Sequence, residues 1–387
     1  TLKASYSLTA DRGPAFVTNS QAILNSYSPW RPSASVTESG MRITELENSE
    51  LTYEKKHEFN VGIDLGFLKN RLNLAADYYR RNNFDLIGVI NTQGAGGTIA
   101  KYANIASMKS SGIELTISSK NMRTKDFSWN TDFIFSKTKN EITDLKSHAN
   151  VLSLISGNGF GREGYPVRGL FSIPFAGLTE DGLPTFINQD GQKTISSFNF
   201  QEYEKLDFLK YEGPTDPTIT GSFGNILTYK NLKLNVFVTY SFGNVIRLDP
   251  VFSNAYSDLD AMPKEFKNRW MKAGDENVTN IPTIVSTRMN QQYAYLNMAY
   301  NAYNYSDVRI ADGGFIRLKE ISLSYDLPAK VINFFRLNKL QLKLQATNLC
   351  LLYADSKLNG QDPEFFRSGG VSTPVPKQFT FTVRLGL

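Results

Sequence analysis

Few side chains in this sequence have the types and spacings that catalysis or metal binding requires. The two histidines, His57 and His148, lie far apart, and neither is spaced for a zinc motif or a catalytic triad. The one cysteine, Cys350, excludes a disulfide framework and a cysteine-rich metal site. We therefore expect a protein that is not an enzyme, with no cofactor and no metal site.

Glycine-rich and acidic turns are the next candidates, because such turns bind phosphate or calcium in other proteins. GAGG (94–97) and GNGFGREG (157–164) lack the preceding strand and following helix that a phosphate-binding loop needs. Asp181-Gly182 and Asp190-Gly191 lack the further oxygen ligands of a calcium loop. We interpret the first two segments as loop tips and the last two as turns of a small hairpin.

Aromatic and arginine side chains in the long loops are better candidates for ligand contact. Aromatic faces stack on sugar rings or clamp apolar peptide side chains, and tyrosine adds a hydroxyl group. Packing within the loops, or contact with a partner, is the alternative for each residue. That alternative is favoured for Trp270, in a short helix expected between Pro263 and Gly274. The candidate substrate-binding residues are Trp30, Phe160, Arg162, Tyr165, Arg168, Tyr256, Trp270, Tyr295 and Tyr303.

The elements that must position these loops are β-strands. In NLKLNVFVTYS (231–241) and KLQLKLQAT (339–347), every second residue is apolar, so each strand has one apolar and one polar face. The same alternation recurs along the chain, with a phase slip between Leu318 and Ile321 that indicates a bulge. The expected strands are about 1–10, 55–68, 71–88, 107–120, 125–143, 217–229, 231–248, 314–327, 339–350 and 376–387.

Composition and connection lengths decide between soluble and membrane β-structure. The chain has 387 residues, 41% of them hydrophobic and 12% aromatic, and no apolar run approaches the roughly 20 residues of a membrane-spanning helix. Its net charge of +5 is too small and too dispersed to favour nucleic acid. Short and long connections alternate, for example Lys69-Asn70 and Lys230 against 11–54 and 144–216. This asymmetry is typical of an outer-membrane barrel with long extracellular loops.

The polar face of the expected sheet would then line the lumen of the barrel. A charge facing lipid at mid-depth costs about 2 to 4 kcal/mol, so Lys233, Lys343 and Glu114 must point inward if the register is right. The expected lumen-facing polar residues are Asp64, Asp77, Glu114, Asp132 and Arg384. The sequence shows no signal peptide, and the strand pattern begins at Thr1, so we expect the C-terminal part of a longer protein.

Several segments resemble the SusC/RagA-like TonB-dependent outer-membrane transporters of Bacteroidetes. The resemblance covers nearly the whole chain in order, and it rests on the hairpin at 51–87 and on the segments SSGIELTISSKN (110–121), GSFGNILTYKNLKLNVFVTYSFGN (221–244), RWMKAGDE (269–276), DGGFIRLKEISLSYDLP (312–328), ATNL (346–349) and NGQDPE (359–364).

The resemblance implies an all-β fold in which residues 1–387 are about ten C-terminal strands of a roughly 22-stranded transmembrane barrel. The plug domain and N-terminal extension of the family are absent from this sequence. It further implies active import of a glycan or oligopeptide at the cell outer membrane. The implied partners are a SusD-like surface lipoprotein, TonB acting through the plug portion, and outer-membrane lipid.

Two other classes stay open at this point. A self-contained ten-stranded barrel, acting as an adhesin or surface-binding protein, requires strand 1–10 to pair with strand 376–387. A soluble all-β carbohydrate-binding protein or hydrolase would expose a large apolar belt to water, which argues against it.

Overall fold

The computed structural model describes residues 1–12, 21–30, 38–91, 94, 100–251, 262, 264–334, 337–366 and 376–386. Of the sequence-based candidates, Tyr256 and most of GAGG (94–97) lie outside these residues. No helix among the described residues is long and apolar enough to cross a membrane.

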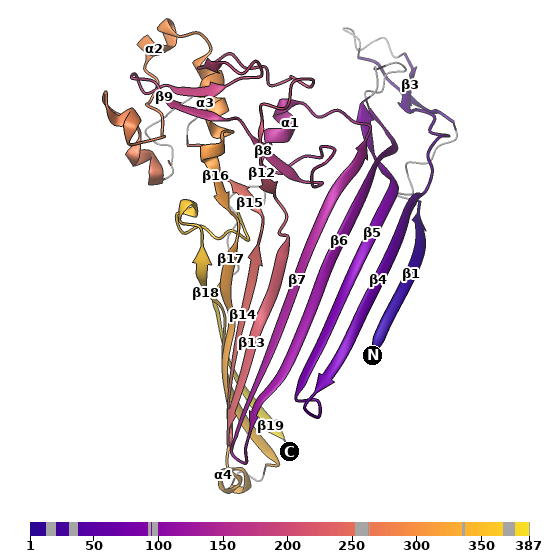
Figure 1. Ribbon diagram of the computed structural model, residues 1–387, viewed down its shortest axis with the longest axis vertical. Helices are drawn as coiled ribbons and strands as arrows, with labels where there is room; N and C mark the ends of the chain where they lie inside the picture. The colour runs from indigo at the N-terminus through magenta and orange to yellow at the C-terminus, as the bar shows by residue number, and fades with distance from the viewer. Residues whose placement is uncertain are drawn as a thin grey trace.

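Ten strands form one antiparallel sheet in which neighbours along the chain are neighbours in the sheet (Figure 1). This confirms the ten expected strands and their order. β5, β6 and β7 continue further toward the long connections than the alternation predicted, so the sheet is tallest there. In sheet order the strands are β1 (Leu2–Asp11), β4 (Glu54–Phe67), β5 (Leu72–Asn91), β6 (Ala100–Arg123), β7 (Phe127–Leu145), β13 (Ile219–Tyr229), β14 (Leu232–Phe242), β17 (Phe315–Asp326), β18 (Lys339–Ala354) and β19 (Gln378–Gly386).

Tight turns join the strands at one end of the sheet. Leu68, Lys69 and Asn70 between β4 and β5, and Lys230 between β13 and β14, all have positive φ angles, between 51° and 62°. Such left-handed residues reverse an antiparallel pair within a few positions. At the same end, β17 and β18 are joined through the short helix α4 (Ala329–Phe334).

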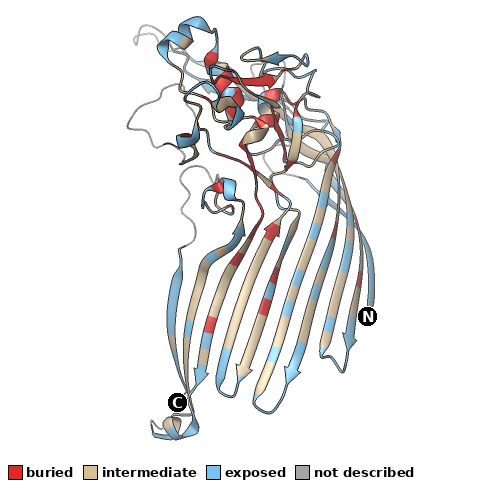
Figure 2. Ribbon diagram, turned by 60° about the vertical axis from the view of Figure 1, so that its left-hand side comes forward, coloured by how far each residue is buried: buried red, intermediate tan, exposed pale blue. Residues whose placement is uncertain are grey.

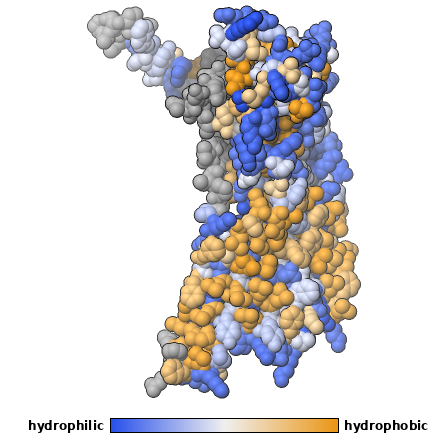
Figure 3. Space-filling view, turned by 90° about the vertical axis from the view of Figure 1, so that its left-hand side faces the viewer, coloured by the Kyte–Doolittle hydropathy of each residue, from blue (hydrophilic) through white to orange (hydrophobic). Residues whose placement is uncertain are grey.

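The register gives the sheet one apolar and one polar face. Because directly paired residues share a face, a continuous apolar row crosses eight strands, and Figure 3 shows the hydrophobic band that such rows form over the strands. The row consists of Leu65, Leu74, Ile117, Phe133, Phe223, Val238, Leu318 and Cys350.

The expected lumen residues all lie on the opposite, polar face. Asp77 pairs with Glu114, and Lys233 belongs to a row with Ser324 and Lys343. Arg384 pairs with Gln341, next to the apolar Leu342–Val383 pair of the other face. The register prediction is therefore confirmed.

The height of the apolar band matches a membrane. Apolar outward-facing side chains extend along β14 from Leu232 to Phe242, about 33 Å at the usual rise per residue. With a strand tilt of about 40°, this corresponds to an apolar belt about 25 Å tall, the value typical of outer-membrane barrels.

The expected bulge lies at Lys319. Phe237 pairs with Glu320 while the next residue, Val238, pairs with Leu318, so Lys319 has no partner in β14. The extra residue restores the alternation on the two sides of the slip.

Two sequence-based boundaries are wrong. The strand expected over 231–248 ends at Phe242, because Gly243 takes a φ of +82° that ends the ladder. Residues 245–247 instead form β15 (Val245–Arg247), paired with β16 (Ile310–Asp312). The helix expected between Pro263 and Gly274 is only the short 3-10 helix η2 (Lys264–Asn268), and a second 3-10 helix, η3 (Asp275–Asn277), begins after Gly274.

The connections β7–β13 and β14–β17 fold together into one body above the sheet, which we call the loop body (residues 146–218 and 243–314). Buried residues concentrate there (Figure 2). Its hydrophobic core draws Leu154 and Phe171 from the first connection and Phe266 and Tyr303 from the second. Its further elements are α1 (Val151–Ile155), β8 (Gly169–Ser172), β9 (Phe175–Leu178), β10 (Pro184–Ile187), β11 (Lys193–Thr194), β12 (Lys210–Pro214), α2 (Thr287–Gln292), α3 (Leu296–Asn304) and η4 (Asp307–Arg309).

The small hairpin expected in the first connection is present. A turn with Gly182 at φ +75° joins β9 to β10, and one with Gly191 at φ +73° joins β10 to β11. The remaining elements belong to other connections: β2 (Ile23–Tyr27) pairs with β3 (Gly40–Glu45), and η5 (Ser356–Leu358) follows β18.

The two faces can be distinguished by placing a lysine on each side of one strand. We expect Ile117→Lys, in the central apolar row of β6, to lower the free energy of unfolding in lipid vesicles by about 2 to 4 kcal/mol. Thr116→Lys, one residue earlier and on the polar face, should change it by less than about 1 kcal/mol. Denaturant titration of the full-length protein in vesicles measures both. Equal effects would contradict the assignment of the faces.

Candidate functional site

A cavity of about 480 Å³ lies where the polar face of the sheet meets the loop body. Its floor comes from three strands, because Thr220, Ser241 and Phe315 form one register row across β13, β14 and β17. Three connections supply the walls. The lining residues are Gly157, Asn158, Arg168, Thr215, Asp216, Pro217, Thr220, Ser241, Asn244, Val245, Ile246, Gly313, Phe315, Pro363, Glu364 and Phe366.

Asn244 is the most informative residue of the cavity. Its side chain is buried, with 9% of the residue exposed, and its Oδ1 atom has no hydrogen-bond partner among the described residues. The amide lies directly against Gly313, where a Cβ atom would clash with Asn244 Nδ2. A buried acceptor without a donor costs about 1 to 3 kcal/mol. A ligand that donates a hydrogen bond here would remove that cost.

An ion pair forms one wall of the cavity. Arg168 Nη1 lies 2.7 Å from Asp216 Oδ1, and Arg168 Nε donates to the carbonyl oxygen of Asn158 at 3.0 Å. Thr215 donates from its backbone nitrogen to the carbonyl oxygen of Arg168 at 2.9 Å. The wall therefore offers a ligand one positive and one negative group, and hydrogen bonds to backbone carbonyl oxygens hold the segment in place.

A buried ion-pair cluster fixes the opposite wall. Arg317 on β17 points from the polar face, and its Nη2 lies 2.6 Å from Asp362 Oδ1 and 3.1 Å from Glu364 Oε2. The side chains of Arg317 and Asp362 are only 5% and 8% exposed. This cluster holds the β18–β19 connection against the strands and so places Pro363 and Glu364 in the cavity wall.

Two more buried arginines hold the loop body together. Arg247 donates from Nη2 to the carbonyl oxygen of Phe171 at 2.6 Å and from Nη1 to that of Ser306 at 3.1 Å, so it joins the two connections. Arg309 pairs with Glu265 Oε1 at 2.6 Å. Buried guanidinium groups require such partners, which makes the loop body a rigid roof for the cavity.

Burial shapes the titration of groups in the loop body. It raises the pKa of Tyr303 to about 12 and raises the pKa of Tyr300 as well, so both hydroxyls stay protonated. Burial also raises the pKa of Glu212, although Lys210 lies 3.5 Å away. Glu212 Oε1 accepts no hydrogen bond from the described residues.

The structure divides the sequence-based site residues into two groups. Arg168 lines the cavity, and Phe160 lies beside it, with its backbone nitrogen donating to Gly169 at 3.0 Å. Arg162 pairs with Asp207 at 2.6 Å and lies over the ring of Tyr165. These residues come together because the segment 157–168 folds back on itself.

The other candidates pack or lie apart. Tyr303 is 1% exposed and belongs to the core, and Tyr165 packs against Phe171 at a ring distance of 5.0 Å. The Trp270 ring packs on Gly182 and so joins the two connections. Trp30 and Tyr295 are exposed and are not among the lining residues.

Sequence reasoning missed the residues that build the cavity. Asn244, Gly313 and Glu364 were not candidates, yet each belongs to a segment singled out for its family resemblance: the end of 221–244, the start of 312–328 and NGQDPE. The available signal was that these three segments are polar and contain glycine.

The site holds no arrangement suited to covalent chemistry among the residues that the structure describes. No group of three metal-ligating side chains occurs in this part of the chain. His57 lies in β4, with Nδ1 3.1 Å from the hydroxyl of Tyr6, and not in the cavity. The arrangement offers amide, hydroxyl and charged groups for binding a polar ligand.

Comparison with known proteins supports the resemblance seen in the sequence. The chain is 26% identical over 348 residues to TonB-dependent receptor P3 of Formosa agariphila, covering 84% of this chain and 32% of that protein. It is 26% identical over 360 residues to TonB-dependent receptor SusC of Bacteroides thetaiotaomicron, covering 88% and 32%. The chain thus spans about a third of these relatives. No family model matches it.

The fold has a solved counterpart. The structure of the RagAB peptide transporter superposes on 99% of this chain and 40% of its own, with a TM-score of 0.76 and 23% identity. The ten-stranded sheet therefore has the fold of the matching part of that chain, in agreement with the all-β barrel strands that the alternation predicted.

The Arg317 cluster is expected to control the β18–β19 connection. Arg317→Gln leaves Asp362 buried without its cation, a loss of about 3 kcal/mol or more. Amide hydrogen exchange of residues 356–366 in the full-length protein should then accelerate about 100-fold. Lys205→Gln, which breaks the exposed Lys205–Asp190 pair, serves as the control and should change no exchange rate detectably. Unchanged exchange at 356–366 would contradict a fixing role.

Glu212 predicts a pH dependence of the loop body. Because its folded pKa is raised, the folded state binds the proton more tightly, and stability falls as pH rises from the unfolded pKa through the folded one. Glu212→Gln should therefore slow amide exchange in 151–172 at neutral pH, with the gain lost below about pH 4. Glu204→Gln, at an exposed position, is the control. A gain that persists at low pH would contradict the burial effect.

Proposed function

We propose, from the premise that this chain is a relative of the SusC/RagA-like TonB-dependent transporters, that it forms part of the wall of an outer-membrane barrel that imports a nutrient. The observation that carries the proposal is the two-faced sheet with a cavity on its polar side. An apolar outer belt suits lipid, and a polar inner face below a rigid loop body suits a solute pathway. The relatives' names supply the coupling to TonB.

The transport step involves binding and release without covalent change. The ligand enters from the long-loop side and contacts the cavity through Asn244, Arg168 and Glu364. A plug, carried by a portion that this chain does not span, then rearranges under the action of TonB. A SusD-like surface lipoprotein acts as a lid over the loop body. The protein has no enzymatic role in this scheme.

The proposed ligand is a glycan or an oligopeptide. Both present many hydrogen-bond donors at fixed spacing, which suits the unpartnered Asn244 carbonyl. An oligopeptide also offers termini of both charges, which suits the Arg168–Asp216 wall. The RagAB structure of similar fold is that of a peptide transporter, which adds weight to the peptide.

A self-contained adhesin barrel is the weaker alternative. It requires β1 to pair with β19, but among the described residues β1 pairs with β4 alone and β19 with β18 alone. The two strands lie at opposite edges of the sheet (Figure 1).

The import proposal is tested in cells that produce the full-length protein. We expect Asn244→Leu, which removes the buried amide at nearly constant volume, to weaken ligand binding about tenfold, equivalent to one hydrogen bond of about 1.4 kcal/mol. Labelled oligosaccharides and oligopeptides are supplied in parallel, and binding and uptake are measured separately. Asn290→Leu on the exposed surface of α2 is the matched control.

Two outcomes would overturn the proposal. Uptake that survives collapse of the proton-motive force would exclude TonB coupling. Surface binding without any uptake, in wild-type cells, would favour the adhesin. If uptake is intact and Asn244→Leu binds normally, import stands and this cavity is not the binding site.

A further inference from the structure

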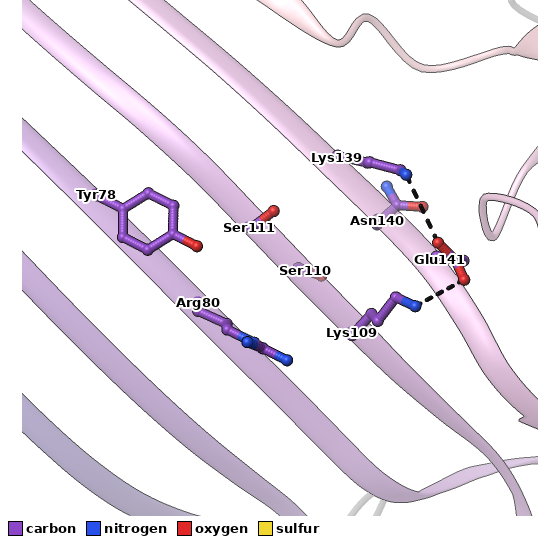
Figure 4. A pocket seen from close by; sticks show the side chains of 8 residues that line it. All are labelled: Tyr78, Arg80, Lys109, Ser110, Ser111, Lys139, Asn140 and Glu141. Atoms are coloured by element: carbon purple, nitrogen blue, oxygen red, sulfur yellow. Dashed lines mark hydrogen bonds and ion pairs between the residues drawn. The ribbon is translucent and has the colours of Figure 1, made fainter.

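A basic cluster lies on the outward, apolar face of the sheet, at the end where the long connections begin. Register rows place Arg80 beside Ser111 and Lys139, and Lys109 beside Glu141. The adjacent row below carries Tyr78, Ile113 and Lys137. Since Ile113 and Tyr78 continue the apolar rows, these charges lie on the lipid side and not in the lumen. Figure 4 shows them spread over three neighbouring strands.

The cluster surrounds a hollow of about 230 Å³ that Tyr78, Arg80, Lys109, Ser111, Lys139 and Glu141 help to line. Glu141 lies between two lysines, 2.8 Å from Lys109 Nζ and 3.7 Å from Lys139 Nζ. Arg80 makes no ion pair with any described residue and is exposed. With Lys137 in the row below, the cluster has four cations, against Glu141 and, in the next outward row, Asp144, which pairs with Ser107. Two positive charges are left over.

Two outward rows at the opposite, short-turn end consist of described residues without charge. The first of these outward rows consists of Met122, Trp129, Leu227, Leu234, Leu323, Leu344 and Phe381. The next row there consists of Phe127, Tyr229, Leu232, Tyr325, Leu342 and Val383. The basic cluster is therefore specific to one membrane surface.

The position of the cluster within the membrane limits the chemical class of ligand that it can bind. Charges on the lipid face cost about 2 to 4 kcal/mol at the midplane but only about 0 to 1 kcal/mol near the interface. Directly below the cluster, Ile113, Leu115 and Phe135 present apolar surface where acyl chains would lie. A cationic hollow above an apolar wall complements an amphiphile with an anionic headgroup.

We propose that this hollow binds the phosphorylated headgroup of an outer-leaflet lipid. Arg80, Lys109 and Lys139 would contact the phosphate, and the hydroxyls of Ser111 and Tyr78 would donate hydrogen bonds to it. Acyl chains would extend along Ile113 and Leu115. This inference rests on the proposed outer-membrane location, with the long connections outside, but not on the imported substrate or on the lumenal cavity.

The experiment measures lipid retention by native mass spectrometry of the full-length protein in detergent. The probes are lipid A, which carries phosphates, its enzymatically dephosphorylated form, and inorganic phosphate as competitor. We expect wild-type protein to retain lipid A, and R80Q/K109Q/K139Q to bind it about tenfold more weakly or worse. The matched control, K267Q/K272Q/R288Q, removes the same charge from exposed positions of the loop body and should bind as wild type.

Each outcome decides the inference. Equal retention by wild type and the cluster variant, or an equal loss in the loop-body control, would overturn it. Wild-type binding of the dephosphorylated lipid at full affinity would also overturn it, because no phosphate is then recognised. Displacement of the lipid by millimolar inorganic phosphate would indicate a free-phosphate site instead.

The failure of this proposal is separable from failure of the import proposal. Membrane fractionation reports the location of each variant, and the uptake assay reports the lumenal site. If R80Q/K109Q/K139Q loses lipid retention but takes up the nutrient normally, the lipid site is supported and is independent of the lumenal site. If R80Q/K109Q/K139Q retains lipid A as wild type does, and uptake depends on Asn244, the import proposal is supported and the lipid site is refuted.

Discussion

Every backbone polar group in a lipid-facing sheet needs a partner within the sheet, and this constraint organises the rest of the structure. Once the ladder is fixed, only the direction of each side chain is free, and it alternates along the strand. One register therefore assigns Leu234 and Phe223 to the lipid and Lys233 and Ser222 to the interior. Among the described residues, the edge strands β1 and β19 each pair on one side only, and an open sheet edge in lipid requires further strands to pair with it.

The loop body differs from the sheet in that it is a compact unit with a buried core of its own. Its core is aromatic, and its backbone irregularities are satisfied by buried arginines. Arg247 donates to carbonyl groups from both connections, and Arg309 pairs with the carboxylate of Glu265. The cavity lies where the sheet meets the loop body, so side chains from the strands and from the loops face each other across it.

The strands and faces could be predicted from the sequence because period-two alternation is a local signal, legible over about ten residues. The bulge was visible for the same reason. Most of the site was not predictable. Asn244 and Gly313 lie at opposite ends of one connection and Glu364 lies in another, so their meeting depends on long-range packing, and Tyr303 could not be told from a ligand-binding tyrosine without its burial. The end of β14 at Phe242 turned on the φ angle of Gly243, which no residue pattern reveals.

The bulge at Lys319 gives the chain an unusual sensitivity to length. Below it the odd-numbered residues of β17 face outward, and above it the even-numbered ones do, so Arg317 lies on the polar face and Phe315 lines the cavity only because one residue is left over. Exchange of Lys319 for another amino acid preserves that count, whereas loss of the codon would turn Arg317 toward the lipid. At this position, then, natural variants should tolerate substitutions but not insertions or deletions.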